Sequence, residues 1–207
     1  MGWPEIREST RDELWIRHYN GPANGYDAGQ AIAVDSAGNA YVTGNHTTDT
    51  GLECVTLKYS TTGDLLWSAP FSGPDNDGVL ISIALDDSAN VYVSGFVFRG
   101  GASDFVTIKY DTNGVEQWNQ LYAGPGSSYD GTYAIAVDNN RNVVVAGYST
   151  GNGTDYDYTT IKYSQSGTPT PTPSVTPSAT PTPTPSVTPT PRPVPSPRPR
   201  PTPRPRP

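Results

Sequence analysis

The sequence predicts an all-β fold of repeated blades, because a unit of about 51 residues recurs three times between residues 14 and 167. Each copy holds short β-prone runs separated by turn residues. Three columns set the register: Trp15, Trp67 and Trp118, then Gly21-Pro22, Gly73-Pro74 and Gly124-Pro125, then Lys58-Tyr59, Lys109-Tyr110 and Lys162-Tyr163. Several strands per unit at this period are typical of β-propellers and solenoids. We therefore expect three β-propeller-type blades of four antiparallel strands, either as an incomplete ring or as a ring latched by its first and last segments.

Composition divides the chain into three segments. Residues 1–13 are polar, residues 14–167 hold the repeats (14–64, 65–115 and 116–167), and residues 168–207 carry 17 of the 22 prolines. Proline at this density removes backbone donors and fixes φ, so the Pro/Thr-rich tail is expected to be a disordered linker or stalk. About 167 residues remain for a packed core, which is one ordinary domain.

The formal net charge of −7 conceals an uneven distribution. The tail contains five arginines and no acid, so residues 1–167 hold 20 acids against 8 bases, a net charge of −12. A folded part this acidic argues against a nucleic-acid partner, which would need clustered Lys and Arg. No apolar run approaches the roughly 18 residues of a membrane span, and no signal peptide is visible in the sequence.

The first copy shows the strands expected of each repeat. Residues 14–20 (LWIRHYN) are β-prone and end at a Gly-Pro turn. Residues 31–34 (AIAV) alternate large and tiny side chains, as in an inner strand buried on both faces. A turn at residues 35–39 leads into the strand at 41–44. In residues 55–59, alternation places the aliphatic and Tyr side chains on one face and Thr and Lys on the other.

The two ends of the repeat region differ in their expected strands. The third copy enters the proline tail after Gly167, so its blade is expected to lack a fourth strand, whereas residues 14–20 are a fourth strand without a blade. Pairing of residues 14–20 with residues 159–163 would latch the ring and protect both edges. The alternatives are a section of a longer array and a homodimer that completes a ring of six blades.

Four segments carry a resemblance to a known family: AIAVDSAGNAYVTG at 31–44, IALDDSANVYVSG at 83–95, AIAVDNNRNVVVAG at 134–147 and DFVTIKYDTNGVEQW at 104–118. They resemble the SBBP-type β-propeller repeats of bacterial surface and secreted proteins, which are similar to NHL repeats. The resemblance covers residues 14–167. It implies a four-stranded blade per repeat and a secreted or cell-surface setting, and it implies no activity. One departure is the replacement of the turn glycine Gly38 by Ala89 and Arg141.

The sequence offers little for catalysis. HExxH, CxxC, GxSxG and Walker-type patterns are absent. The two histidines, His18 and His46, do not recur in the other copies and are expected to be surface or packed residues. Cys54 has no second cysteine to pair with, and its counterparts Phe105 and Tyr158 indicate a small buried side chain rather than a reactive thiol. We expect no cofactor.

Acidic residues are the remaining candidates for a site, in two columns. The first column comprises Asp27, Asp77 and Asp130, ahead of the inner strands. On one rim these carboxylates could hold a hard cation such as Ca²⁺, but we favour loop capping, in which each Asp accepts hydrogen bonds from backbone amides. The second column comprises Asp35, Asp86 and Asp138 and is expected to form turns.

These features favour a non-enzymatic, secreted or cell-surface β-propeller binding or scaffold module on a proline-rich stalk. Rigid blades, with one Trp per blade packed between sheets, would hold variable loops at residues 45–53, 96–104 and 148–157 for a protein or glycan partner. One alternative is a propeller hydrolase or lyase with a rim-bound metal, and another is a purely structural spacer. Fold alone does not choose between them.

Overall fold

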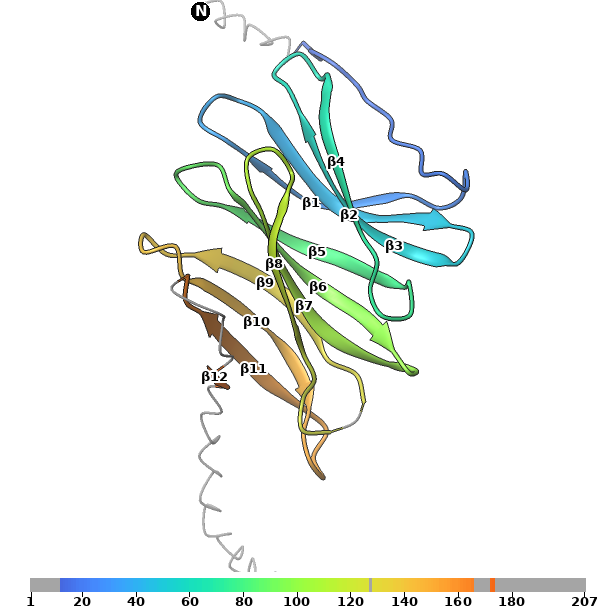
Figure 1. Cartoon of the computed structure of the whole chain (residues 1–207), viewed down its shortest axis with the longest axis vertical. Coiled ribbons are helices and arrows are strands. Elements are labelled where there is room, and N and C mark those ends of the chain that lie inside the picture. The colour runs from blue at the N-terminus through green and yellow to red at the C-terminus, as the bar shows by residue number, and fades with distance from the viewer. Residues whose placement is uncertain (1–11, 127, 166–171, 174–207) are drawn as a thin grey trace, which may run out of the picture. The chain divides into compact units, whose positions relative to one another are not determined.

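The computed structural model describes residues 12–126, 128–165 and 172–173, which form three antiparallel sheets (Figure 1). Sheet 1 contains β1 (Ala28–Val34), β2 (Ala40–Thr48), β3 (Gly51–Tyr59) and β4 (Leu65–Phe71). Sheet 2 contains β5 (Gly78–Leu85), β6 (Val91–Arg99), β7 (Ala102–Tyr110) and β8 (Glu116–Tyr122). Sheet 3 contains β9 (Gly131–Val137), β10 (Val143–Thr150), β11 (Tyr156–Tyr163) and β12 (Thr172–Pro173). The predicted all-β fold of four-stranded, propeller-like blades is confirmed.

Two of the segments predicted from composition lie mostly outside the residues that the structure describes. Residues 1–11 of the polar amino-terminal segment and the predicted disordered tail, apart from Thr172–Pro173, lie outside the described residues. Within the described part of the chain, no helix has the length and apolar character needed to cross a membrane.

The three sheets share one register, down to their irregularities. A bulge interrupts the first strand pair of each sheet, as between Gly29 and Ala31 in sheet 1 and between Leu80 and Ser82 in sheet 2. The bulge brings the first strand close to a glycine of the second: a Cβ atom on Gly44 would lie 1.9 Å from the carbonyl oxygen of Ala28. The glycine that ends each YVTG-like motif is therefore required by this close backbone approach.

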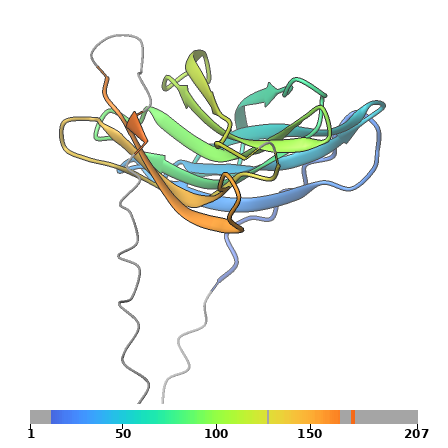
Figure 2. The same ribbon diagram turned by 90° about the horizontal axis from the view of Figure 1, so that it is seen from below.

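The sheets are offset from the sequence repeats. Each Trp-containing run begins a repeat, yet it pairs as the fourth strand of the preceding sheet: β4 joins β3 and β8 joins β7. The first strands β1, β5 and β9 neighbour one another in sequence order, and Figure 2 shows β4 and β8 along the opposite side of the sheets. Adjacent repeats are thus tied together by hydrogen bonds as well as by packing.

Each sheet has two distinct faces. The front face carries the side chains equivalent to Val42, Val55 and Leu57, and the back face carries those equivalent to Tyr41 and Cys54, since alternate residues point to opposite sides. The back face of sheet 1 packs on the front face of sheet 2 in one core cluster. The back face of sheet 2 packs on the front face of sheet 3 in another. The predicted split of residues 55–59 between two faces is confirmed.

The tryptophans pack as predicted. Trp67 and Trp118 adjoin the two clusters between sheets, and Trp15 packs on the front face of sheet 1 with Val55, Leu57 and Tyr59. Exposed large apolar side chains are concentrated at the first and last sheets.

Residues 14–20 were predicted to form a strand, and this prediction is wrong: they lie across the front face of sheet 1 without ladder pairing to a described strand. The predicted latch to residues 159–163 is also absent, because β12 pairs with Ile161 and Lys162 at that edge. Sheet 3 therefore has a fourth strand, although it is only two residues long. A β-prone run needs a neighbouring strand to form a ladder, and residues 14–20 meet a sheet face instead.

The inner strands were predicted to be buried on both faces, which is wrong for β1. Ile32 is 65% exposed and Val34 is 61% exposed, whereas their equivalents Ile83 and Leu85 pack into the cluster between sheets 1 and 2. The difference arises because no described sheet covers the front of sheet 1, and residues 14–20 cover only part of it.

Candidate functional site

One rim of the blades is built from three matching turns, each centred on an aspartate. In sheet 2, the Asp86 carboxylate accepts hydrogen bonds from the backbone N–H groups of Ser88 and Asn90 at 2.9 Å, from Asn90 Nδ2 at 2.8 Å and from Tyr92 OH at 3.1 Å. Asp35 and Asp138 make the same backbone contacts in their turns. The prediction that this column forms turns is confirmed.

The electrostatics of these turns favour the ionised carboxylate. Burial tends to raise the pKa of Asp86, but the hydrogen bonds from Asn90, Ser88 and Tyr92 outweigh it and leave the pKa below its ordinary value. The pKa of Asp138 is also lowered, mainly by hydrogen bonds from Asn142 and Lys162. Ionised, fully bonded carboxylates of this kind stabilise a turn and have no lone pair directed at a ligand.

The first acidic column, Asp27, Asp77 and Asp130, lies at the other rim, in the segment that precedes the first strand of each sheet. Asp27 accepts from the backbone N–H groups of Gly21 at 2.9 Å and Thr47 at 3.1 Å. Asp130 accepts from those of Gly124 at 2.6 Å and Thr150 at 3.0 Å. Each carboxylate therefore joins the loop ahead of it to the second strand of its sheet.

Asp77 departs from this pattern, since its backbone carbonyl, rather than its carboxylate, accepts from the Phe98 N–H at 2.9 Å. The structure does not bring the three carboxylates together. Among the residues that it describes, no group of three His, Cys, Asp or Glu side chains is arranged to hold a metal ion. A rim-bound Ca²⁺ stays a hypothesis from the sequence.

The hairpin tips at this second rim differ from one sheet to the next. The segments predicted as loops at 45–53, 96–104 and 148–157 are mostly strand, because cross-strand pairs such as His46↔Glu53 and Val97↔Asp104 continue nearly to each tip. The tips themselves are Asp49-Thr50, Gly100-Gly101 and the longer segment 151–155. Gly100 and Gly101 both have positive φ, and a Cβ on either would meet open space.

A hydrogen-bonded network beside the first of these hairpins was not predicted. Tyr19 OH lies 3.1 Å from His46 Nδ1, and His46 Nε2 lies 2.8 Å from Glu53 Oε2. Ser72 donates to the other oxygen of Glu53. Since Ser72 contacts the carboxylate and not the imidazole, the arrangement does not form a Ser-His nucleophile pair. It ties residues 14–20 to sheet 1, and it agrees with the expectation that His46 is packed.

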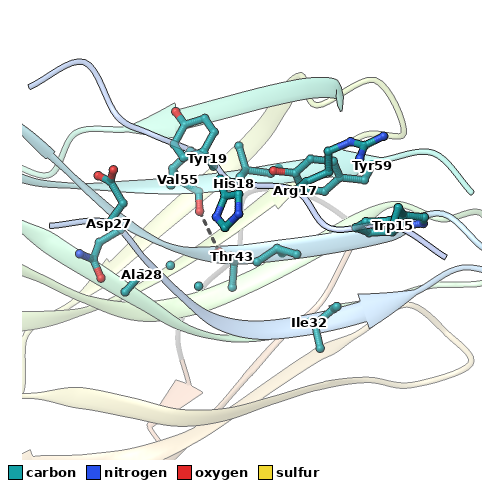
Figure 3. Close-up of a pocket in the computed structure, with 15 residues that line it drawn as sticks. Trp15, Arg17, His18, Tyr19, Asp27, Ala28, Ile32, Thr43, Val55 and Tyr59 are labelled. Atoms are coloured by element: carbon teal, nitrogen blue, oxygen red, sulfur yellow. Dashed lines mark hydrogen bonds between the residues drawn. The ribbon is translucent and has the colours of Figure 1, made fainter. Parts of the chain in front are cut away.

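The front face of sheet 1 contains a pocket of about 340 Å³ (Figure 3). Apolar side chains of sheet 1, among them Ile32, Val42 and Leu57, form its floor. Trp15 and Arg17 of the amino-terminal segment form its wall. Such a pocket can accept an apolar or aromatic side chain, because most of its lining surface is apolar.

The back face of sheet 3 contains four clustered tyrosines, which we call the tyrosine patch: Tyr133, Tyr148, Tyr156 and Tyr158. The ring centroids of Tyr133 and Tyr148 are 5.4 Å apart, and those of Tyr148 and Tyr156 are 4.8 Å apart. Tyr158 is 86% exposed, whereas its equivalents Phe105 and Cys54 are almost fully buried by the next sheet. The patch is thus an interface-type surface that no described residue covers.

Cys54 lies in the core between sheets 1 and 2, as the sequence predicted for a small buried side chain. Burial, followed by the charges of Glu53 and Asp77, raises the pKa of its thiol to about 12. A thiol with so high a pKa is a poor nucleophile near neutral pH.

Comparison with known families agrees with this architecture. A family model described as "SBBP: Beta-propeller repeat" matches residues 15–45. The match runs from Trp15 through β1 into β2, and sheets 2 and 3 repeat the register of that region. No curated protein shows a significant match to the chain. The family match on the first repeat and the same blade built three times together support an SBBP-type β-propeller repeat protein.

Proposed function

We propose that this protein is a non-enzymatic, secreted or cell-surface β-propeller module that binds a protein or glycan partner through its hairpin tips. In this proposal the blades are a rigid scaffold, and the proline-rich tail acts as a stalk that holds the scaffold away from its attachment point. The proposed extracytoplasmic setting rests on the resemblance of the repeat sequences to those of bacterial surface and secreted proteins, and the proposed stalk rests on the composition of the tail.

The observation that carries the proposal is the contrast between the two rims. The three Asp-centred turns repeat the same hydrogen bonds at nearly the same distances. The three hairpin tips at the other rim differ in length and composition: Asp49-Thr50, Gly100-Gly101 and residues 151–155. A repeated structural rim opposite a varied rim is expected of a scaffold that presents binding loops.

Exposed side chains near the varied rim suit recognition. Tyr26 is exposed in the connection that precedes β1, and Tyr129 occupies the equivalent position before β9. The backbone carbonyls of both tyrosines accept a hydrogen bond from a threonine, Thr47 or Thr150, so their backbones are fixed while their rings are free. Fixed tyrosines provide a large contact area at low entropic cost for both protein and sugar surfaces.

The test is a tip replacement. The purified full chain is screened against a panel of bacterial surface polysaccharides and against a phage-displayed peptide library. A variant in which residues 151–155 are replaced by Asp-Thr, as in the first tip, should lose binding and keep its unfolding midpoint. Asp87→Ala, a change of an exposed residue at the opposite rim, should keep both. Failure to select any ligand, or binding that survives replacement of all three tips, would contradict the proposal.

A further inference from the structure

The two interfaces within the chain use equivalent residues. Between sheets 1 and 2, Trp67 packs against Gly114 and its Nε1 donates to the carbonyl oxygen of Thr112 at 3.1 Å. Lys58, the register partner of Trp67, directs its Nζ to the same oxygen at 3.4 Å. Each such interface therefore joins a Trp and a Lys from neighbouring strands of one sheet to the last hairpin turn of the next.

The interface between sheets 2 and 3 uses the equivalent Trp and Lys, with a ring contact and a side-chain oxygen in place of the carbonyl. Trp118 pairs with Lys109 in register, and its ring centroid lies 6.0 Å from that of Tyr163 in sheet 3. Lys109 Nζ donates to Gln165 Oε1 at 2.6 Å. In both interfaces, the back face of one blade thus contacts the front face of the next through the same Trp and Lys positions.

The front face of sheet 1 carries one half of a third interface. Trp15 packs against Gly63 as Trp67 packs against Gly114, and its Nε1 donates to the carbonyl oxygen of Thr61 at 3.2 Å. Arg17 adds a hydrogen bond from Nε to the Gly63 carbonyl at 2.7 Å. Residues 14–20 therefore occupy the place of the fourth strand of a preceding blade, and no described strand pairs with them.

The back face of sheet 3 carries the other half. Tyr158 stands where Phe105 and Cys54 are buried by the next sheet. Lys162 stands where Lys58 and Lys109 reach a following blade, and its side chain is instead largely exposed beside Asp138. At the outer edge of β11, the only described strand is Thr172–Pro173, and it pairs with Ile161 and Lys162 alone. Pro173 has no N–H to donate, so this edge is weakly closed.

We propose that a second copy of this chain covers these surfaces. The back face of sheet 3 in each copy would pack on the front face of sheet 1 in the other. Residues 14–20 of the second copy would add to β11 as its fourth strand and displace β12. Because the two halves lie on the same chain, two copies satisfy both faces and close a ring of six blades, within the usual range of about 4 to 8.

The register follows from the two interfaces already present. Lys58↔Trp67 and Lys109↔Trp118 are equivalent pairs, so Lys162 pairs with Trp15 of the second copy. Counting along the antiparallel strands then pairs Thr159 with His18 of the second copy. Lys162 of one copy would then reach the Thr61 carbonyl of the second copy, which already accepts a hydrogen bond from Trp15 of that copy. This contact would match that of Lys58 and Trp67 with the Thr112 carbonyl.

The first test is the mass of the full chain in solution, measured by light scattering over a range of concentrations. The expected result is a dimer that dissociates when Tyr158 is changed to Asp. Val115→Asp is the matched control: Val115 is also exposed, lies in a turn of sheet 2, and has Asp64 as its equivalent in the first repeat. A monomer at every concentration, an open-ended series of larger assemblies, or a dimer unaffected by Tyr158→Asp would overturn the proposal.

The second test fixes the register by disulfide trapping. A chain carrying His18→Cys is mixed with a chain carrying Thr159→Cys and oxidised, so that a disulfide between these positions must join two copies. Buried Cys54 is kept in both. Efficient heterodimer formation is expected, and Thr160→Cys should link far less because its side chain points to the opposite face. Equal linking by both positions would overturn the register. The hairpin tips take no part in the proposed dimer contact. A negative result for the dimer would therefore leave the proposed function untouched, and the reverse also holds.

Discussion

Removal of the Asp86 carboxylate should destabilise the fold far more than removal of its neighbour Asp87. The Asp86 side chain is only 3% exposed, and it accepts four hydrogen bonds from three residues. Asp86→Ala leaves those donors without an acceptor. Of the three residues, Tyr92 is fully buried, so its hydroxyl cannot turn to water.

The expected magnitude follows from these partners. A buried donor left without an acceptor costs about 1–3 kcal/mol. The Tyr92 hydroxyl and the half-buried Asn90 are affected most, whereas Ser88 is exposed and can bond to water. The free energy of unfolding should therefore fall by about 2–4 kcal/mol. At a typical urea dependence of about 1–3 kcal/mol/M, this corresponds to a midpoint shift of about 1–2 M.

The assay is urea unfolding of Asp86→Ala and Asp87→Ala, followed by tryptophan fluorescence. Asp87→Ala removes the same charge from an exposed position with no hydrogen bond, and should stay within about 0.5 kcal/mol of the parent. Since the folded-state pKa of Asp86 is lowered, its stabilisation is present above the ordinary Asp pKa of about 4 and is lost as pH falls toward the folded-state value. Equal midpoints for the two variants at pH 7 would refute this account of the turn.

Three further outcomes are expected. Ala89 holds the turn position of Gly38 with a φ of 58°, so Ala89→Gly should raise the free energy of unfolding by about 0.5–1 kcal/mol. A lower thermal unfolding midpoint for this variant would contradict the claim that the Ala89 backbone is strained. The Cys54 thiol, with its pKa raised to about 12, should resist a thiol reagent at pH 8 in the folded protein and react in urea. Rapid reaction of Cys54 in the folded protein would contradict its burial in the core between sheets 1 and 2. Burial also raises the pKa of Tyr163 to about 12, so stability should decline between about pH 10 and pH 12 as the unfolded chain ionises first; an unchanged urea midpoint across that range would disprove this.

The repeat columns predicted much of the fold. The Lys-Tyr pairs, which are identical in all copies, hold equivalent places at the ends of β3, β7 and β11, and Trp67 and Trp118 hold equivalent places in β4 and β8. The sequence did not predict that residues 14–20 lie on a sheet face. Their β-propensity is the same whether or not a strand lies beside them, and only the three-dimensional neighbours decide.

The candidate site was less predictable. The loop-capping role of Asp27 and Asp130 follows from local turn chemistry and could be inferred from the sequence. The network of Tyr19, His46 and Glu53 joins residues far apart in the chain. The pairing of His46 with Glu53 could have been found from the sequence, since counting back from the two-residue hairpin tip places these residues opposite each other. The contact of Tyr19 depends on the path of residues 14–20 and has no counterpart in the sequence.

The most direct test of this account is the NMR chemical shift of two glycines. Trp15 lies on Gly63 as Trp67 lies on Gly114: Cβ atoms built on these glycines would lie 2.8 Å and 2.7 Å from Cδ2 of the respective Trp rings. We predict that ring currents shift one α-proton of both glycines strongly upfield, and that Trp15→Ala removes the shift at Gly63 alone. An upfield shift at Gly114 with an ordinary shift at Gly63 would contradict the claim that residues 14–20 take the place of a preceding blade.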